Sequence, residues 1–253
     1  MKNIILSARK VCKTFSQGGT KTQILKSVSA DIYDGDFTVI MGASGAGKST
    51  LLYSLSGMDG ITDGEVLFDG KNISGLSEKK QARLRSESFG FVFQQTHLAS
   101  DLTLFENVAV AGYVGKKAAV SSVREKALDL LRQMNVDNAK DRLPSQVSGG
   151  EAQRAAIARA MINSPKMIFA DEPTGALDKS NSAEVMRLLT ELNGNGQSIL
   201  MVTHDIRAAI HGNRILYMED GKILSELNLP PYFDGCEKPH ERVIGEWLSA
   251  LRW

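Results

Sequence analysis

The stretch GASGAGKST, residues 42–50, decides the fold class of this chain. It fits the pattern G-x-x-x-x-G-K-[ST], in which glycines let the backbone turn tightly and approach phosphate oxygens. The apolar run FTVIM at 37–41 is typical of a buried strand, and Leu51, Leu52 and Leu55 follow with helical spacing. A loop between a strand and a helix N-terminus directs backbone N–H groups at an anion. The stretch therefore predicts a phosphate-binding loop in an α/β fold.

Each part of this loop has an expected role. Lys48 should reach the β- and γ-phosphates, and the Ser49 hydroxyl should bind Mg²⁺. A chance glycine-rich turn is the alternative interpretation, and the flanking strand and helix patterns argue against it. The expected cradle consists of Gly42, Ala43, Ser44, Gly45, Ala46, Gly47, Lys48, Ser49 and Thr50.

Bulk properties exclude several classes of protein. The 253 residues carry a net charge of +1, so no broad basic face for nucleic acid is implied. Cys12 and Cys236 form no CxxC pair, which argues against a metal site or disulfide framework and favours a reducing compartment. The N-terminus lacks the apolar region of about 7–15 residues of a secretory signal. No run approaches the roughly 18 apolar residues of a membrane span, so we expect membrane attachment only through a partner.

Strand and helix patterns alternate along the chain. This order predicts a mainly parallel sheet covered on both faces, with a helical subdomain at about 95–162. A guanine-specific N-K-x-D is absent, since the string at 138–141 has its lysine one place late. Strands are expected at 4–12, 24–32, 64–70, 89–93, 166–170 and 198–203, with a hairpin at 214–218 and 223–227. Helices are expected at 121–135, capped by Ser121 or Ser122, at 152–162 and around 185–192.

A second group of motifs lies further along the chain. VSGGEAQR, residues 147–154, precedes a helix, where Ser148, Gly149 and Gly150 would expose N–H groups as a second anion site. Asp171 and Glu172 follow the apolar strand MIFA, residues 167–170. Taken alone, S-G-G before a helix is an ordinary N-cap, and an Asp-Glu pair after a strand is an ordinary loop start.

Together with the phosphate loop, these motifs resemble ATP-binding cassette (ABC) ATPases over nearly all of residues 3–226. VSGGEAQR resembles the family signature, and MIFADE resembles its Walker B strand. The resemblance implies a P-loop NTPase fold with a mainly parallel RecA-like core sheet, an antiparallel β subdomain and an α-helical subdomain. It places the ATP-binding domain at 1–227 and a C-terminal extension at 228–253.

The resemblance also implies a mechanism with two chains and two MgATP. Ser148, Gly149 and Gly150 of one chain would face the γ-phosphate held by the other chain's phosphate loop. Asp171 would reach Mg²⁺ through water, and Glu172 would activate or position the attacking water. The implied metal set is Ser49, Gln94 and Asp171, and the implied catalytic set is Lys48, Glu172 and His204.

Four further roles rest on position in the family pattern. Asp178, which ends the run PTGALD, would contact the opposite chain, and His204 would contact the γ-phosphate. Gln94 would approach Mg²⁺ and the attacking water, while residues 95–107 would touch a transmembrane permease. Phe15 would stack on adenine. The alternatives are a surface glutamine, a structural histidine and a core phenylalanine.

Departures from the family pattern are mild. Val147 stands where Leu is usual, Glu151 where Gln is common, and Phe15 where Tyr is more frequent. The stretches GFVFQQ, ADEPTGALD and MVTHD are most similar to a bacterial branch of lipoprotein-releasing, macrolide-exporting and cell-division cassettes, with antimicrobial-peptide transporters alongside. This branch implies a separately encoded permease and a cytoplasmic location on the inner face of the membrane.

Competing functions differ in sequence features. A DNA-repair cassette needs a long coiled coil, which residues 51–147 cannot hold, and a translation factor carries two cassettes, whereas this chain has one phosphate loop. A sensor without hydrolysis would not need Glu172. A non-transport ATPase that regulates a membrane or signalling partner stays the alternative.

The tail carries an apolar stripe of Val243, Ile244, Trp247, Leu248 and Leu251. We expect a helix packed on its own domain, and the alternative is a contact with the second chain or the permease.

Overall fold

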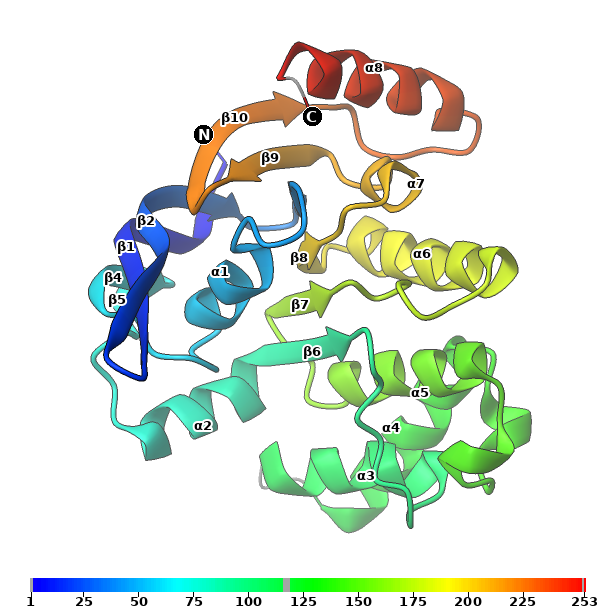
Figure 1. Cartoon of the computed structure of the whole chain (residues 1–253). Coiled ribbons are helices and arrows are strands. Elements are labelled where there is room, and N and C mark those ends of the chain that lie inside the picture. Colours follow the sequence, from blue (N-terminus) through cyan, green and yellow to red (C-terminus); the bar gives the residue numbers. More distant parts are fainter. Residues whose placement is uncertain (1, 116–118, 252) are drawn as a thin grey trace. The chain divides into compact units, whose positions relative to one another are not determined.

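The structure is a computed structural model that describes residues 2–115, 119–251 and 253. The chain forms two compact units, residues 1–77 with 193–253 and residues 78–192. Figure 1 labels the helices and strands of both units. In the described part of the chain, no helix is both long and apolar enough to span a membrane.

An antiparallel sheet in the order β2-β1-β4-β5 forms one part of the first unit. Its strands are β1 (Ile4–Gln17), β2 (Thr20–Tyr33), β4 (Asp63–Phe68) and β5 (Lys71–Asn72). Leu6, Val11, Leu25 and Ile32 are buried on it, so its inner face contributes to the core of the unit. The two long strands pair along their whole length, from Ile4 opposite Tyr33 to the turn after Gln17.

Parallel strands carry the phosphate loop in the same unit. Strand β3 (Phe37–Met41) pairs in parallel with β8 (Ser198–Val202) and with β9 (Arg214–Glu219), and β10 (Lys222–Asn228) returns antiparallel to β9. All five residues of β3 and of β8 are buried, as the apolar runs predict. Helix α1 (Lys48–Leu55) follows β3 and the loop.

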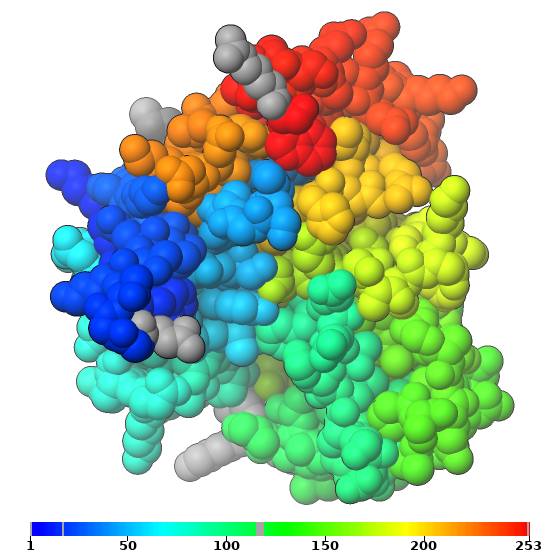
Figure 2. Space-filling view, viewed as in Figure 1, coloured from blue at the N-terminus to red at the C-terminus, as the bar shows by residue number. Residues whose placement is uncertain are grey.

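The C-terminal helix packs on its own unit. Helix α8 (Glu237–Ala250) lies beside β10 in Figures 1 and 2 and buries Ile244 and Leu248. The Trp247 ring meets the Tyr217 ring edge-on at 6.2 Å, and its Nε1 donates to Ser225 Oγ at 3.1 Å. The short helix α7 (Ile206–Ala209) also contacts α8. The interpretation of the tail as a helix packed on its own domain therefore agrees with these contacts.

The second unit combines two parallel strands with helices. Strand β6 (Phe89–Phe93) pairs in parallel with β7 (Met167–Asp171), from Phe89 opposite Met167 to Phe93 opposite Asp171. Helices α3 (Leu104–Gly115), α4 (Val120–Gln133) and α5 (Gly149–Met161) pack on one another. Helices α2 (Glu78–Ser88) and α6 (Lys179–Gly194) and two short 3₁₀ turns, Asp137–Ala139 and Pro144–Gln146, complete the elements.

Most expected elements are present, with shifted ends. The expected cap of α4 is wrong, because the helix begins after Ala119, which makes no side-chain cap. Helix α5 begins three residues earlier than expected, since Ser148 caps it directly. Helix α2 was not expected from the sequence, because it has no buried residue and hence no apolar stripe.

His211 provides a test of packing beneath the tail. Its ring stacks on Tyr232 at 4.2 Å, and burial lowers the pKa of His211 from 6.5 to about 4. As pH falls from 6.5 to 4, His211 becomes protonated in the unfolded chain and stays neutral in the folded chain. The free energy of unfolding therefore falls by up to about 3 kcal/mol. Above pH 6.5 this group contributes no pH dependence.

We expect His211→Phe, which keeps an aromatic ring beside Tyr232, to remove this part of the acid destabilisation. The measurement is the free energy of unfolding in urea from pH 8 to pH 4 for both proteins. Equal pH profiles would show that His211 titrates normally in the folded chain.

Candidate functional site

The phosphate loop leaves β3 at a place where only glycine fits. Gly42 has a φ of 155°, and a Cβ built there would lie 2.0 Å from the carbonyl oxygen of Met218 in β9. Because backbone cannot yield as a flexible side chain does, the loop must begin with a residue that lacks a side chain. Strand pairing between β3 and β9 thus fixes the start of the loop.

Lys48 is anchored inside the loop it belongs to. Its Nζ donates to the carbonyl oxygens of Gly42 at 2.8 Å and of Ala43 at 2.9 Å, and the side chain is buried. These bonds hold the ammonium charge within the turn. Helix α1 begins after Gly47 without a side-chain cap, so its N-terminus is arranged for an external anion.

Phe15 is a surface residue of β1. It is 45% exposed, so the core interpretation of this ring is wrong. One side of the ring is met by Lys13 Nζ, which lies 4.8 Å from its centroid. The Lys13 ammonium is itself held by the Asp59 carboxylate and the Gly60 carbonyl oxygen, both at 2.5 Å. A fixed, exposed aromatic ring can offer a stacking face to a planar base.

His204 lies in the same unit, just beyond the carboxyl end of β8, and it is exposed. The turn around it is fixed on both sides. Thr203 Oγ1 accepts the Asp205 N–H at 3.0 Å, and the Asp205 carboxylate accepts the Arg207 N–H at 2.9 Å and caps α7. The first unit therefore carries Phe15, the phosphate loop and His204.

The second unit brings Gln94 and the two acidic residues to one edge of its strand pair. Phe93 and Asp171 are partners in the parallel register of β6 and β7. Gln94 and Glu172 therefore follow the carboxyl ends of two adjacent strands. Glu172 has a φ of 47° and starts a turn in which its carbonyl oxygen accepts the Gly175 N–H at 2.9 Å. The left-handed backbone of Glu172 fits the tight turn that follows β7.

The signature forms a reciprocal cap on α5. Ser148 Oγ accepts the Glu151 N–H at 3.3 Å, while the Glu151 carboxylate accepts the Ser148 N–H and hydroxyl at 2.8 Å each. These two donors lower the pKa of Glu151, so its carboxylate is ionised at the helix N-terminus. The sequence contains the capping-box pattern S-x-x-E at these positions, and no capping box was predicted from it.

Gly150 joins the signature to the turn at Asp178. A Cβ at Gly150 would lie 1.8 Å from Oδ1 and 2.9 Å from Cβ of Asn181. Asn181 in turn donates its N–H and its side-chain amide to the two carboxylate oxygens of Asp178, at 2.9 and 2.7 Å. Asp178 thus caps α6 through a residue that packs directly on the signature. The role of Asn181 was not expected from the sequence.

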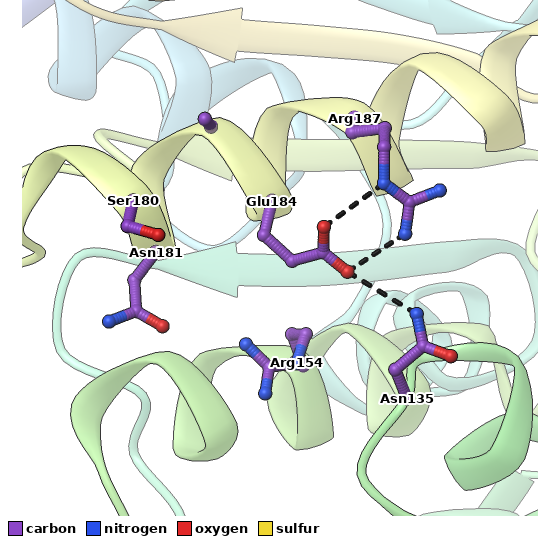
Figure 3. Close-up of a pocket in the computed structure, with 7 residues that line it drawn as sticks. Asn135, Arg154, Ser180, Asn181, Glu184 and Arg187 are labelled. Atoms are coloured by element: carbon purple, nitrogen blue, oxygen red, sulfur yellow. Dashed lines mark hydrogen bonds and ion pairs between the residues drawn. The ribbon is translucent and has the colours of Figure 1, made fainter.

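A polar pocket of about 410 Å³ opens beside these elements (Figure 3). Inside it, Glu184 accepts from Arg187 and from Asn135, and the Arg187 bonds lower the pKa of Glu184 to about 2. Glu184 and Arg187 thus pair with each other, whereas the buried Nε of Arg154 has no hydrogen-bond partner among the described residues, and none of the expected site residues lines the pocket. The lining residues are Asn135, Arg154, Ser180, Asn181, Ala183, Glu184 and Arg187.

The donor set fits a magnesium-bound triphosphate. A glycine loop with an anchored lysine and an uncapped helix N-terminus suits phosphate oxygens. The Ser49 hydroxyl and the Asp171 carboxylate are oxygen ligands of the kind that Mg²⁺ prefers. The phosphate loop belongs to the first unit, and Asp171 belongs to the second.

Comparisons with known proteins agree with this chemistry. The sequence profile of the family described as ABC transporter matches residues 25–175. A dimeric structure of the ATP-binding cassette MJ0796, in a post-hydrolysis state with ADP and Pi, is 38% identical and covers 90% of this chain and 100% of its own, with a TM-score of 0.84. A second dimeric structure of MJ0796, described as a bacterial ABC transporter cassette, gives the same values.

A structure of cbiO1 from Clostridium perfringens, part of the ABC transporter complex cbiONQ, is 28% identical. It covers 97% of this chain and 92% of its own, with a TM-score of 0.81. Fold and site together define a P-loop ATPase that binds ATP with Mg²⁺. The chain belongs to the ABC transporter family and has the cassette fold expected from its sequence.

The contact between Gly150 and Asn181 predicts an asymmetry between two helical glycines. Gly150→Ala must displace Asn181 and so loosen the cap of α6, which should lower the free energy of unfolding by about 1–2 kcal/mol. Gly245→Ala in α8 meets nothing within 4 Å and should raise it by about 0.5–1 kcal/mol. Urea unfolding of both variants checks the pair, and a stable Gly150→Ala protein would contradict the contact.

Proposed function

We propose that this chain is the ATP-hydrolysing subunit of a bacterial ABC transporter and that two copies close over two MgATP. Two helix N-termini carry the proposal: the one after Gly47 has no side-chain cap, and the one after Ser148 adds the backbone N–H groups of its first turn beside the reciprocal cap of Ser148 and Glu151. A single triphosphate needs one glycine loop. A second anion-binding turn in the same chain is explained when it meets the nucleotide of the other copy.

The proposed mechanism assigns a role to each group. The phosphate loop and Lys48 hold the β- and γ-phosphates, and bound Mg²⁺ supplies charge neutralisation. Glu172 accepts or orients the proton of the attacking water, and Gln94, from the adjacent strand end, orients the same water. His204 donates toward the γ-phosphate. Ser148, Gly149 and Gly150 complete the site from the partner copy, and Asp178 links the two sites.

A permease contact is proposed for residues 95–107 and the neighbouring face of α3. Three apolar side chains on α3 are exposed, Val110 at 45%, Tyr113 at 42% and Val114 at 73%. Exposed apolar side chains on one helix are typical of an interaction surface. Through this contact the cassette would lie on the inner face of the membrane and drive export, lipoprotein release or antimicrobial-peptide resistance.

Glu172→Gln should lower kcat by about 10²–10⁴-fold, the usual contribution of a general base, and trap an ATP-bound dimer. Sedimentation with saturating MgATP measures the dimer, and phosphate release measures turnover. Lys48→Ala is the control, because it should lose ATP affinity and therefore form no ATP-bound dimer. A Glu172→Gln protein that stays monomeric with bound ATP would refute the two-copy scheme.

The permease proposal predicts co-purification. A tagged chain expressed in its own bacterium should retain a multi-spanning membrane protein, and Val110→Asp should lose it because a charge cannot be buried in an apolar contact. Leu224→Asp, at a position 53% exposed on β10, is the matched control and should keep the partner. Retention by both variants would place the partner contact elsewhere.

A further inference from the structure

Gln153 is a buried polar side chain that has no role in the mechanism proposed above. It lies on α5, within the signature 147–154 and one turn after Gly149, and is 1% exposed. Its amide Nε2 donates to the carbonyl oxygen of Phe93 at 2.9 Å and to the carbonyl oxygen of Pro173 at 2.8 Å. An amide nitrogen carries two hydrogens, so one side chain satisfies both carbonyls.

The two acceptors identify what this amide holds. Phe93 is the residue before Gln94, and Pro173 is the residue after Glu172. The bridge therefore ties together the chain segments that present the two proposed water-orienting groups. Gln153 lies on α5, the helix that begins in the signature. A movement of α5 would therefore displace the ends of both β6 and β7.

Neighbouring contacts strengthen this arrangement. Arg159, two turns along the same helix, donates to the carbonyl oxygens of Thr96 and His97 at 2.6 Å each. Segment 94–97 is thus tied to α5 at both ends. A Cβ at Gly175 would lie 2.9 Å from Nε2 of Gln94, so the Gln94 side chain packs over the turn that Glu172 starts.

We infer that Gln153 is a positioning residue for ATP hydrolysis, which sets the spacing of Gln94 and Glu172 from the signature helix. Its task needs two donors at one nitrogen. A carboxylate would repel both carbonyl oxygens, and an apolar side chain would remove both hydrogen bonds. The inference rests on the proposed roles of Gln94 and Glu172.

Gln153→Met in the full chain tests the inference, since Met keeps the volume and removes both donors. We expect kcat to fall by about 10–100-fold, because a displacement of about 1 Å at a reacting group costs up to about 10²-fold. The ATP concentration for half-maximal rate should stay nearly unchanged, since the phosphate loop is untouched. Gln153→Asn, whose shorter amide cannot span both carbonyls, should act in the same direction if Met impairs folding.

Asn193→Leu is the matched control. Asn193 Nδ2 also donates to two backbone carbonyl oxygens, those of Gly35 and Gln197, both at 2.9 Å, and these bonds lie outside the site. Its loss should lower the melting temperature and leave kcat unchanged. If Gln153→Met lowers only the melting temperature and leaves kcat at the wild-type value, the inference is overturned.

A double-mutant cycle with Gln94→Ala separates positioning from general damage. If Gln153 acts through Gln94, its substitution should cost less in the Gln94→Ala chain than in the wild type, and equal costs would overturn the inference. Glu172→Gln distinguishes the two levels of the argument. An active Glu172→Gln chain would contradict the proposed catalytic scheme. An inactive Glu172→Gln chain together with a fully active Gln153→Met chain would contradict only the role of Gln153.

Discussion

The close approach of Gly42 to the carbonyl oxygen of Met218 is the constraint on which the first unit depends. Strand β3 runs parallel to β9, and the loop can leave the strand there only without a side chain. That geometry sets where α1 begins and where Lys48 is anchored. The phosphate loop therefore starts with glycine because the pairing of β3 with β9 leaves no room for a side chain at that place.

In the second unit, polar side chains hold the segments that follow the strands. Its strand ends present backbone carbonyls, and the buried amide of Gln153 and the guanidinium of Arg159 satisfy four of them from one helix. Such groups are costly to leave unpaired, so α5 is held in one place relative to β6 and β7. The helix that begins at the signature is thereby part of the frame of the acidic turn.

The sequence was sufficient for features that depend on local pattern and insufficient for those that depend on tertiary contacts. The loop at 42–50 and the buried strands at 37–41 and 89–93 follow from glycine spacing and apolar runs, and the structure has these strands at the expected residues. Helix α2 was missed because it buries no side chain, and the cap expected at Ser121 or Ser122 failed because α4 begins one residue before them. The bridge by Gln153 joins residues 60 and 20 positions away in sequence, and no local pattern predicts it.

The N-termini of α1 and α5 are capped differently, and this difference decides which of them binds nucleotide first. Helix α1 begins without a side-chain cap, whereas α5 begins with the ionised Glu151 carboxylate already bound to the Ser148 N–H and hydroxyl. An anion that approaches α5 must compete with that carboxylate for the Ser148 hydroxyl, and it meets like charge. We therefore expect the phosphate loop to take the nucleotide first. The signature should engage only when a second copy brings a triphosphate whose charge is already neutralised by Mg²⁺ and lysine.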